Sequence, residues 1–284
     1  MGLAHFGGVH VYAGAYMKRF ILGVTFVLSV SGCGVSQQQE VQMGAQYAQQ
    51  IDQQLPLVRD PEINRYINVL GDSISRLTAR GDLEWHFFIV DSKEVNAFAV
   101  PGGYIYVNRG LIERAEKMDE IAGVLGHEIG HVVRRHTIKQ MQQQQKANIG
   151  VTLACVLTRV CDSQAAQAGI QVAGTALFAR FSRTDEKEAD DEGFTNVVRA
   201  GISPEGMVTM FQRLLEERKT RPAGVEAWFA THPLEEDRIA DIQRLINALD
   251  PAKLASLSSD SKNFHTFKER VQSLPPSPTP RRVQ

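Results

Sequence analysis

Residues 120–133 read EIAGVLGHEIGHVV, an apolar, helix-compatible run that contains two histidines and a glutamate. Residues four positions apart lie on one face of a helix, so His127 and His131 can bind the same metal ion. Glu128 is rotated from His127 by about 100° on a helix, so it lies beside the ligands and is suited to act as the general base for an attacking water. The stretch therefore predicts a helix that carries a catalytic zinc site.

The bare pattern of two histidines and a glutamate also occurs on ordinary helix surfaces, where the glutamate is simply solvated. Here the run is too apolar for a solvated face, and an unpaired buried carboxylate is costly. The longer zinc motif of the metzincin class needs glycine at 134 and histidine at 137, whereas this chain has Arg134 and Thr137. His136 lies on the opposite face of a continuous helix from His127, and we interpret it as an ordinary surface histidine.

A catalytic zinc site usually has three protein ligands and one open position, so a third ligand must come from elsewhere in the chain. The acidic stretch 182–193 (SRTDEKEADDEG) is the candidate region. Glu186 and Asp190 are four residues apart, which lets one bind the metal while the other accepts the free N–H of a ligand histidine. Glu188 and Glu192 have the same spacing, so the residues alone leave two choices open.

The remaining sequence pattern predicts an α+β fold that is mainly helical and contains a small sheet. Residues 85–90 (WHFFIV) and 104–107 (YIYV) are aromatic and β-branched runs, separated by the turn signal at 101–103 (PGG). Helices are expected where apolar residues recur at helical spacing. The expected helices are residues 36–54, 63–77, 119–137, 185–199, 204–221 and 234–249, with a helical hairpin at 149–181.

The N-terminus has the three-part layout of a secretory signal. Met17 begins a short basic head, residues 20–30 (FILGVTFVLSV) form an apolar run, and Cys33 follows two small residues. The run is too short to span a membrane as a mature helix, and its ending resembles the lipobox of bacterial lipoproteins. We predict a signal peptide within residues 1–32 with translation starting at Met17, lipidation of Cys33, and a tether at 33–40.

The residue after the cysteine bears on the location of the chain. Gly34 stands there in place of an aspartate, which by resemblance to Gram-negative lipoproteins favours sorting to the outer membrane. Two or more acyl chains on Cys33 would anchor the protein durably. We therefore expect a periplasmic protein, held by its lipid in the inner leaflet of the outer membrane.

Composition limits the class of partner and the extent of the folded part. The formal net charge of −1 for 284 residues argues against a nucleic-acid partner, which usually requires a basic excess. Residues 251–284 are polar and rich in proline towards their end, which predicts a disordered tail. Cys155 and Cys161 would have Cα atoms about 9 Å apart on one unbroken helix. That separation exceeds the reach of a disulfide, so two buried thiols are favoured over a pair.

Four motifs in order extend this interpretation. They are NAFAVPGG at 96–103, HEIGH at 127–131, EKEAD at 186–190, and THPL at 231–234 followed by Arg238. Together they resemble the gluzincin zinc metallopeptidases that include HtpX, the CAAX prenyl proteases, the Oma-type proteases and the BepA-like periplasmic members. The resemblance implies a zinc peptidase domain over residues 41–250, with a short edge strand beside the active-site helix.

The resemblance also implies roles for particular residues. It places the zinc ligand at Glu186 in preference to Glu188, and the hydrogen-bond partner of a ligand histidine at Asp190. His232 and Arg238 match positions near the metal, where the histidine can cap the zinc in a resting state and the arginine can stabilise the oxyanion. An extended peptide would add a strand along the segment at Asn96, Phe98, Pro101, Gly102, Gly103 and Tyr104.

Two functions are compatible with these features. The first, implied by the resemblance, is a zinc-dependent endopeptidase with one Zn²⁺ per chain that removes misfolded or misassembled envelope proteins. The second is a lipid-anchored chaperone or assembly factor, working with the envelope assembly machinery, whose metal site is silent or structural. A structural site closes its fourth position with a protein ligand, so the metal coordination discriminates between them.

Overall fold

The computed structural model describes residues 34–144, 180–233 and 236–278, and the described residues from Val35 onward form one compact unit. The predicted signal peptide and Cys33 lie outside the described residues, as do Cys155, Cys161 and most of the predicted hairpin. Among the described helices, none combines the length and the apolar character that crossing a membrane would need.

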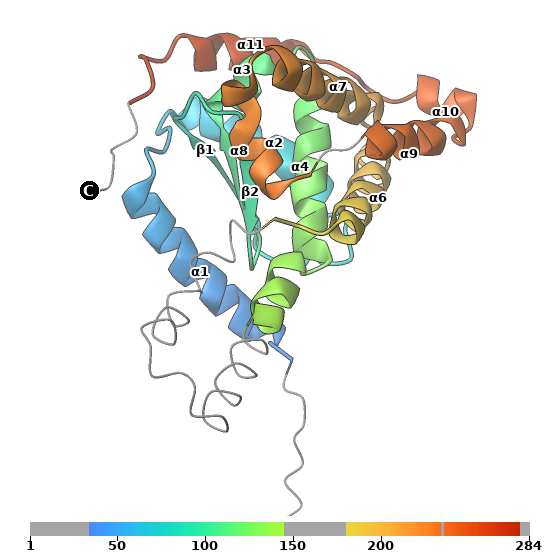
Figure 1. Cartoon of the computed structure of the whole chain (residues 1–284). Helices are drawn as coiled ribbons and strands as arrows, with labels where there is room; N and C mark the ends of the chain where they lie inside the picture. Colours follow the sequence, from blue (N-terminus) through green and yellow to red (C-terminus); the bar gives the residue numbers. More distant parts are fainter. Residues whose placement is uncertain (1–33, 145–179, 234–235, 279–284) are drawn as a thin grey trace, which may run out of the picture. The chain divides into compact units, whose positions relative to one another are not determined.

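A three-stranded sheet lies at the centre of the fold (Figure 1). Its strands are β1 (His86–Val90), β2 (Ala97–Val100) and β3 (Tyr104–Asn108), in the order β1-β3-β2. β1 is parallel to β3, and β2 is antiparallel to it. The predicted strands at 85–90 and 104–107 are confirmed, whereas β2 was not predicted as a strand, because its four residues are too few to show an alternation.

The turn between β2 and β3 requires glycine. Gly102 and Gly103 have φ angles of +84° and +100°, in a region that side-chain-bearing residues rarely occupy. Helix α1 (Gln37–Gln54) packs directly on this turn. A Cβ atom at Gly44 of α1 would lie 1.8 Å from the carbonyl oxygen of Pro101, so the two backbones are in contact.

The strand alternation divides the apolar side chains between two clusters. Phe87, Ile89 and Ile105 face the main core, which also contains the apolar sides of α2 (Pro61–Ser75) and α4 (Met118–Val133). Tyr106 and Phe98 face the smaller cluster, which α1 and the helical residues 136–144 cover. The sheet is therefore buried on both faces, with α4 against one of them.

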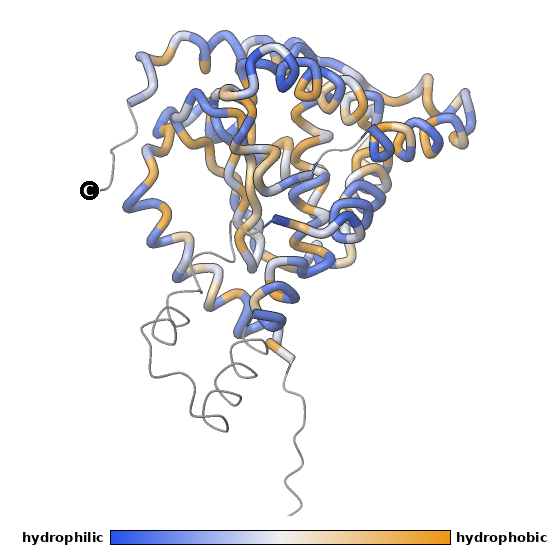
Figure 2. Tube along the Cα trace, viewed as in Figure 1, coloured by the Kyte–Doolittle hydropathy of each residue, from blue (hydrophilic) through white to orange (hydrophobic). Residues whose placement is uncertain are grey.

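The remaining helices are α3 (Arg109–Arg114), α6 (Arg183–Arg199), α7 (Glu205–Thr220), α8 (Pro222–Thr231), α9 (Glu236–Asn247), α10 (Pro251–Ala255) and α11 (Lys262–Gln272). Of these helices, α6 and α7 pack directly on α4. Figure 2 shows α4 as largely apolar and α6 as largely hydrophilic, in keeping with a central and a peripheral helix. The mainly helical α+β prediction is confirmed.

One predicted helix differs from the observed one, and one observed helix was not predicted. The helix expected at 119–137 ends at Val133, Arg135 has a φ of +58°, and helical structure resumes at His136. α8 was not predicted; it follows α7 directly and has Pro222 in its first turn, where a missing N–H costs nothing. Both differences concern residues that carry or adjoin the candidate site.

The prediction of a disordered tail at 251–284 is wrong for residues 251–272, which contain two helices, at 251–255 and 262–272. Phe264 and Val271 are fully buried in the main core, and Phe267 stacks on Tyr66 with ring centroids 4.3 Å apart. The spacing of these apolar residues is helical, but the polar composition around them obscured it. The C-terminal helix is part of the folded domain.

We expect Phe264→Ala to lower the free energy of unfolding by about 3–5 kcal/mol, because it removes a fully buried aromatic ring from the core. Val69→Ala is the matched control, since Val69 is 60% exposed and should change stability by no more than about 0.5 kcal/mol. Urea unfolding of both variants, followed by circular dichroism, measures the difference. Equal stability of the two variants would exclude α11 from the core.

Candidate metal centre and active site

Four side chains from three parts of the chain converge within the main core. His127 and His131 come from α4, Glu186 from α6, and His232 from the residue that follows α8. One potential ligand atom from each lies within 4.8 Å of all the others, and all four residues are buried. Such a convergence of buried imidazoles and a carboxylate is typical of a metal centre.

The distances show which atoms face one another. Nε2 of His127 is 3.1 Å from Nε2 of His131 and 3.3 Å from Nδ1 of His232. Oε1 of Glu186 is 3.5 Å from Nε2 of His131 and 3.2 Å from Nδ1 of His232. Imidazole nitrogens and a carboxylate oxygen are ligands that zinc accepts in proteins, so the residues present fit a zinc ion.

The packing of α6 on α4 places Glu186 opposite the histidines. A Cβ atom at Gly130 of α4 would lie 2.6 Å from the carbonyl oxygen of Ala189 in α6. The helices approach this closely because both have small residues at the contact. Ser182 starts α6 with a capping box in which its hydroxyl accepts a hydrogen bond from the backbone N–H of Asp185. Glu186 therefore lies in the first turns of α6, beside the histidines.

Asp190 and Arg238 contact the clustered side chains on the side away from the centre of the cluster. Nδ1 of His127 donates to Oδ1 of Asp190 at 2.8 Å, which leaves Nε2 of the ring free to face the cluster. Arg238 donates to Asp190 through Nε at 2.7 Å and through Nη2 at 2.8 Å, and it also donates to Glu186. Burial alone would raise the pKa of Glu186, but the charges of His232 and Arg238 outweigh it and hold that pKa well below its ordinary value.

Arg238 was predicted to stabilise an oxyanion, and the structure turns its guanidinium towards two carboxylates. Burial alone would raise the pKa of Asp190, but the charge of Arg238 lowers it below its ordinary value. Arg238 is 8% exposed, so these ion pairs lie in an environment of low polarity. The contacts assign Arg238 to the support of Asp190 and Glu186, and a contact with the oxyanion stays a prediction.

Glu128 differs from the other carboxylates of the site. It is fully buried, and neither of its carboxylate oxygens has a hydrogen-bond partner among the described residues. Its nearest charged or titratable neighbour is His232, whose Nε2 is 3.4 Å from Oε1. Burial raises the pKa of Glu128 above its ordinary value. A buried carboxylate without hydrogen bonds is costly, and such groups are typical of functional positions.

His232 lies between the other potential ligands and Glu128. Its Nδ1 faces His127 and Glu186, and its Nε2 faces Glu128. The ring of Trp228 stacks on it with centroids 4.7 Å apart. In this arrangement His232 supplies a fourth protein ligand atom to the cluster.

Phe181 packs on the cluster through the rings of His131 and His232. Its ring stacks on His131 with centroids 3.9 Å apart, and its backbone N–H donates to the carbonyl oxygen of Thr231 at 3.0 Å. The segments around Phe181 and His232 are therefore joined directly beside the cluster. Sequence reasoning missed both Phe181 and Trp228, because lone aromatic residues give no signal of what they cover.

His136 was predicted to be a surface histidine, and this prediction is wrong. Its side chain is fully buried, and its Nδ1 is 2.9 Å from Nδ1 of His131. The helix break at Arg135 is the physical reason, because the prediction assumed that the helix continued. Glu188, the rival third ligand, lies outside the cluster and is 3.2 Å from Nε2 of His136.

The predicted substrate segment lies along β2 and the turn that follows it. β2 is at the edge of the described sheet and packs against α4, and its Phe98 is buried against Tyr106. The turn at 101–103 instead packs against α1, and Tyr104 stacks on His86 with centroids 4.8 Å apart. The carbonyl oxygen of Asn96 accepts from the N–H of Asn108 at 2.9 Å.

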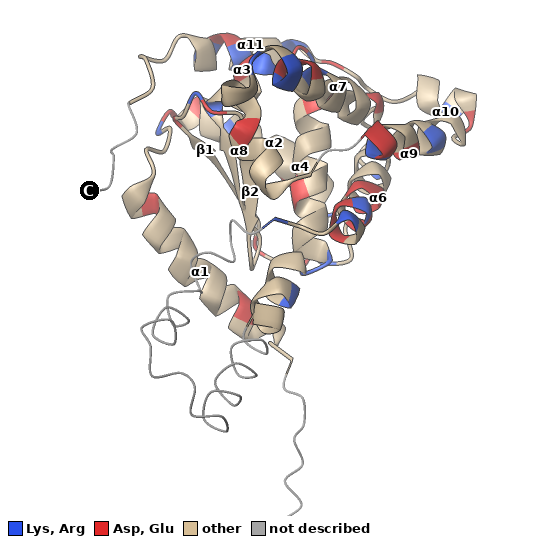
Figure 3. Cartoon of the chain, viewed as in Figure 1, with Lys and Arg blue, Asp and Glu red and all other residues tan. Residues whose placement is uncertain are grey.

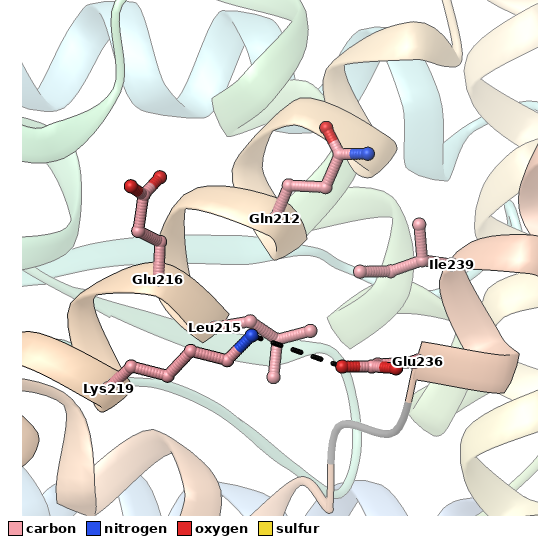
Figure 4. A pocket seen from close by; sticks show the side chains of 6 residues that line it. All are labelled: Gln212, Leu215, Glu216, Lys219, Glu236 and Ile239. Atoms are coloured by element: carbon pink, nitrogen blue, oxygen red, sulfur yellow. Dashed lines mark ion pairs between the residues drawn. The ribbon is translucent and has the colours of Figure 1, made fainter.

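A surface groove of about 440 Å³ lies between α7 and α9 (Figure 4). It is lined by Gln212, Leu215, Glu216, Lys219, Glu236 and Ile239. Lys219 and Glu236 face each other across it, with Nζ and Oε1 4.0 Å apart. The groove contains none of the four clustered residues, so we do not assign it to the candidate active site. Figure 3 shows that charged residues are concentrated on the outer helices, α6 among them.

Comparison with known proteins agrees with this geometry. The chain is 32% identical over 250 residues to the beta-barrel assembly-enhancing protease of Escherichia coli K12, an alignment that covers 85% of this chain and 50% of that protein. It is 30% identical over 182 residues to the metalloprotease LoiP of the same strain, covering 64% and 68%. It is 26% identical over 178 residues to the mitochondrial metalloendopeptidase OMA1 of Schizosaccharomyces pombe, covering 63% and 51%.

The chain thus spans about half the length of the beta-barrel assembly-enhancing proteases that it matches. The model of peptidase family M48 matches residues 57–246, which include the sheet, α4 and all four clustered residues. The resemblance drawn from the four motifs is confirmed. The chain belongs to peptidase family M48.

Proposed function

We propose that this chain is a zinc-dependent endopeptidase in which His127, His131 and Glu186 hold the metal and Glu128 is the general base. The observation that carries the proposal is the contrast between two kinds of buried carboxylate. Glu186 lies among the imidazoles and is paired with Arg238, whereas both oxygens of Glu128 lack hydrogen bonds in the described structure. A catalytic site needs one group that binds metal and another that is available for a proton.

The residues of the chain suit this chemistry. When bound, zinc would lower the pKa of a water molecule to about 7 and polarise the peptide carbonyl. Glu128 would take the proton of the attacking water on a carboxylate oxygen and pass it to the leaving amine. Burial raises the pKa of Glu128, which makes its carboxylate a stronger base than an exposed one. Asp190 keeps His127 in the tautomer whose Nε2 can bind metal.

The proposed substrates are misfolded or misassembled envelope proteins. The relatives named for beta-barrel assembly support this class of substrate, although they share only half of their length with this chain. An unfolded chain can offer its backbone to the edge strand β2, which packs on the active-site helix α4. The N-terminal sequence supports a periplasmic protein anchored in the outer membrane through an acylated Cys33.

We further propose that the structure represents a resting arrangement. His232 supplies a fourth ligand atom and faces Glu128, so it occupies the space where an attacking water would have to lie. The ring stacking of Trp228 and Phe181 keeps this arrangement buried. Displacement of His232 would open the fourth position of the metal to water and substrate.

The same four ligand atoms support a second candidate function. A site closed by four protein ligands is typical of structural zinc, which would suit a lipid-anchored chaperone or assembly factor. Glu128 favours the enzyme, because a purely structural site has no need of a buried carboxylate whose oxygens lack hydrogen bonds. Zinc content and cleavage of an unfolded protein separate the two functions.

We expect Glu128→Gln to retain zinc and to cleave casein about 10²–10⁴-fold more slowly, because the proton acceptor is lost while the ligands remain. Glu226→Gln is the control, since Glu226 is exposed on α8. Metal analysis and casein turnover are measured for the wild type and both variants. Equal turnover by the wild type and Glu128→Gln would exclude Glu128 as the base.

Asp190→Asn should weaken zinc binding by about tenfold or more, because the amide cannot pair with Arg238 or polarise His127 as the carboxylate does. Asp191→Asn is the adjacent control; Asp191 pairs with Lys187 on the outer side of α6. Zinc affinity is determined by competition with a chelator, and circular dichroism checks the fold of each variant. The assignment of Asp190 is contradicted if both variants bind zinc as tightly as the wild type.

His232→Ala should raise casein cleavage at saturating zinc, because the fourth ligand position becomes accessible to water. His265→Ala is the control, because His265 is an exposed histidine on α11. Initial rates at equal zinc occupancy are compared. Unchanged or lower activity in His232→Ala would count against a resting role for His232 and leave the proposed ligands His127, His131 and Glu186 unaffected.

A further inference from the structure

His136 is the first residue of the helical segment that follows the active-site helix. Its side chain is fully buried, whereas Arg134 is exposed and Arg135 is half-buried. The side chain of His136 therefore points back into the protein. Its imidazole is in contact with His131, one of the proposed ligands, and with the carboxylates of α6. This is a polar side chain buried beside the metal centre to which the proposed reaction assigns no role.

The two hydrogen-bonding atoms of His136 have different partners. Nδ1 is 2.9 Å from Nδ1 of His131. Nε2 is 3.2 Å from Oε2 of Glu188 and 3.6 Å from Oδ1 of Asp185. The contacts therefore form a continuous line from a partly exposed carboxylate, through His136, to the ring of His131.

The protons of this line can be placed by elimination. Nε2 of His131 faces the cluster, and a nitrogen that binds metal has no proton. The proton of the neutral His131 ring must then lie on Nδ1, which donates to Nδ1 of His136. A neutral His136 that accepts at Nδ1 carries its own proton on Nε2, and this atom faces the acceptor Glu188. Every donor in the line meets an acceptor.

His127 shows what such a contact achieves. Its Nδ1 donates to Asp190, which fixes the ring so that Nε2 faces the cluster. A metal-binding histidine usually needs a partner of this kind for its second nitrogen. For His131, the described structure offers His136 in the corresponding position and no carboxylate at hydrogen-bond distance from Nδ1.

We infer that His136 is a positioning residue of the metal centre: it accepts the Nδ1 proton of His131, and Glu188 orients it in turn. This inference rests on the proposed metal site. It gives the two histidines of α4 different supports, a carboxylate for His127 and an imidazole for His131. It also gives Glu188, the residue that competed with Glu186 for the third ligand position, a role behind a ligand instead of on the metal.

The backbone break at Arg135 is what turns His136 inward. Arg135 has a φ of +58°, an uncommon conformation for a residue with a side chain. Its guanidinium donates to the buried carboxylate of Glu40 at 2.8 Å and to the backbone of Val35, both near the start of α1. Arg80 donates to the other oxygen of Glu40 at 2.7 Å and to the carbonyl oxygen of Val132 in α4. These contacts hold the break, and thereby His136, in place.

Two substitutions at His136 separate positioning from packing. His136→Asn places an amide oxygen where Nδ1 of the histidine was, so an acceptor for His131 remains. His136→Leu fills nearly the same volume without an acceptor. A residue that only packs would tolerate the apolar leucine at least as well as the asparagine.

Zinc affinity, measured by chelator competition on the full folded chain, should fall about 10–100-fold in His136→Leu. It should stay within about threefold of the wild type in His136→Asn. His265→Leu, an exposed histidine that pairs with Asp260, is the control and should bind zinc normally. The free energy of unfolding of each metal-free variant is measured in parallel, because a merely structural role would lower that quantity instead of zinc affinity.

The outcomes are distinct. Wild-type zinc affinity in His136→Leu, or equal losses in the leucine and asparagine variants, would overturn the positioning role. Failure of the wild type to bind zinc would overturn the proposed function itself, independently of His136. A selective loss in His136→Leu that His136→Asn restores supports the inference.

Discussion

The close contact between α4 and α6 is the constraint on which the site depends. Gly130 and Gly126 of α4 face Ala189 and Gly193 of α6, and a Cβ atom at Gly193 would lie 2.9 Å from the backbone of Gly126. A side chain at any of the three glycines would separate the helices by more than the cluster tolerates, since its potential ligand atoms lie within 4.8 Å of one another. The helix-to-helix distance and the ligand geometry are therefore one property of the fold.

The helical repeat, and not this contact, explains why the motifs were readable in the sequence. His127 and His131 are related by the helical repeat alone, and so are Glu186 and Asp190. Spacing of this kind depends only on the helix that contains both residues and not on the rest of the fold. The choice of Glu186 over Glu188 depended on resemblance, because helical spacing is the same for both pairs. The structure separates them through α6, which turns Glu186 towards the cluster and Glu188 towards His136.

What the sequence did not reveal depends on contacts between distant segments. The helix break at Arg135 is held by Glu40 of α1, which is distant in the sequence, so the residues near Arg135 do not predict it. The burial of His136 follows from that break. β2 is a short edge strand whose four residues are all buried, which removes the alternation that would identify it. In α11 the apolar residues have helical spacing, but the polar composition of the segment outweighed them. Each error arose where tertiary contacts outweigh local preference.

The charges of the buried side chains also link the fold to the candidate metal centre. Glu128, Glu186 and Asp190 are buried together, and Arg238 is the cation paired with two of them. With the histidines neutral, as binding of a metal ion requires, and the carboxylates ionised, three carboxylates and one guanidinium leave a formal charge of −2 in an environment where an uncompensated charge is costly. A divalent cation among the imidazoles and Glu186 would balance this charge and join α4, α6 and His232. The ion that would activate water would thus also stabilise the packing of the helices around it.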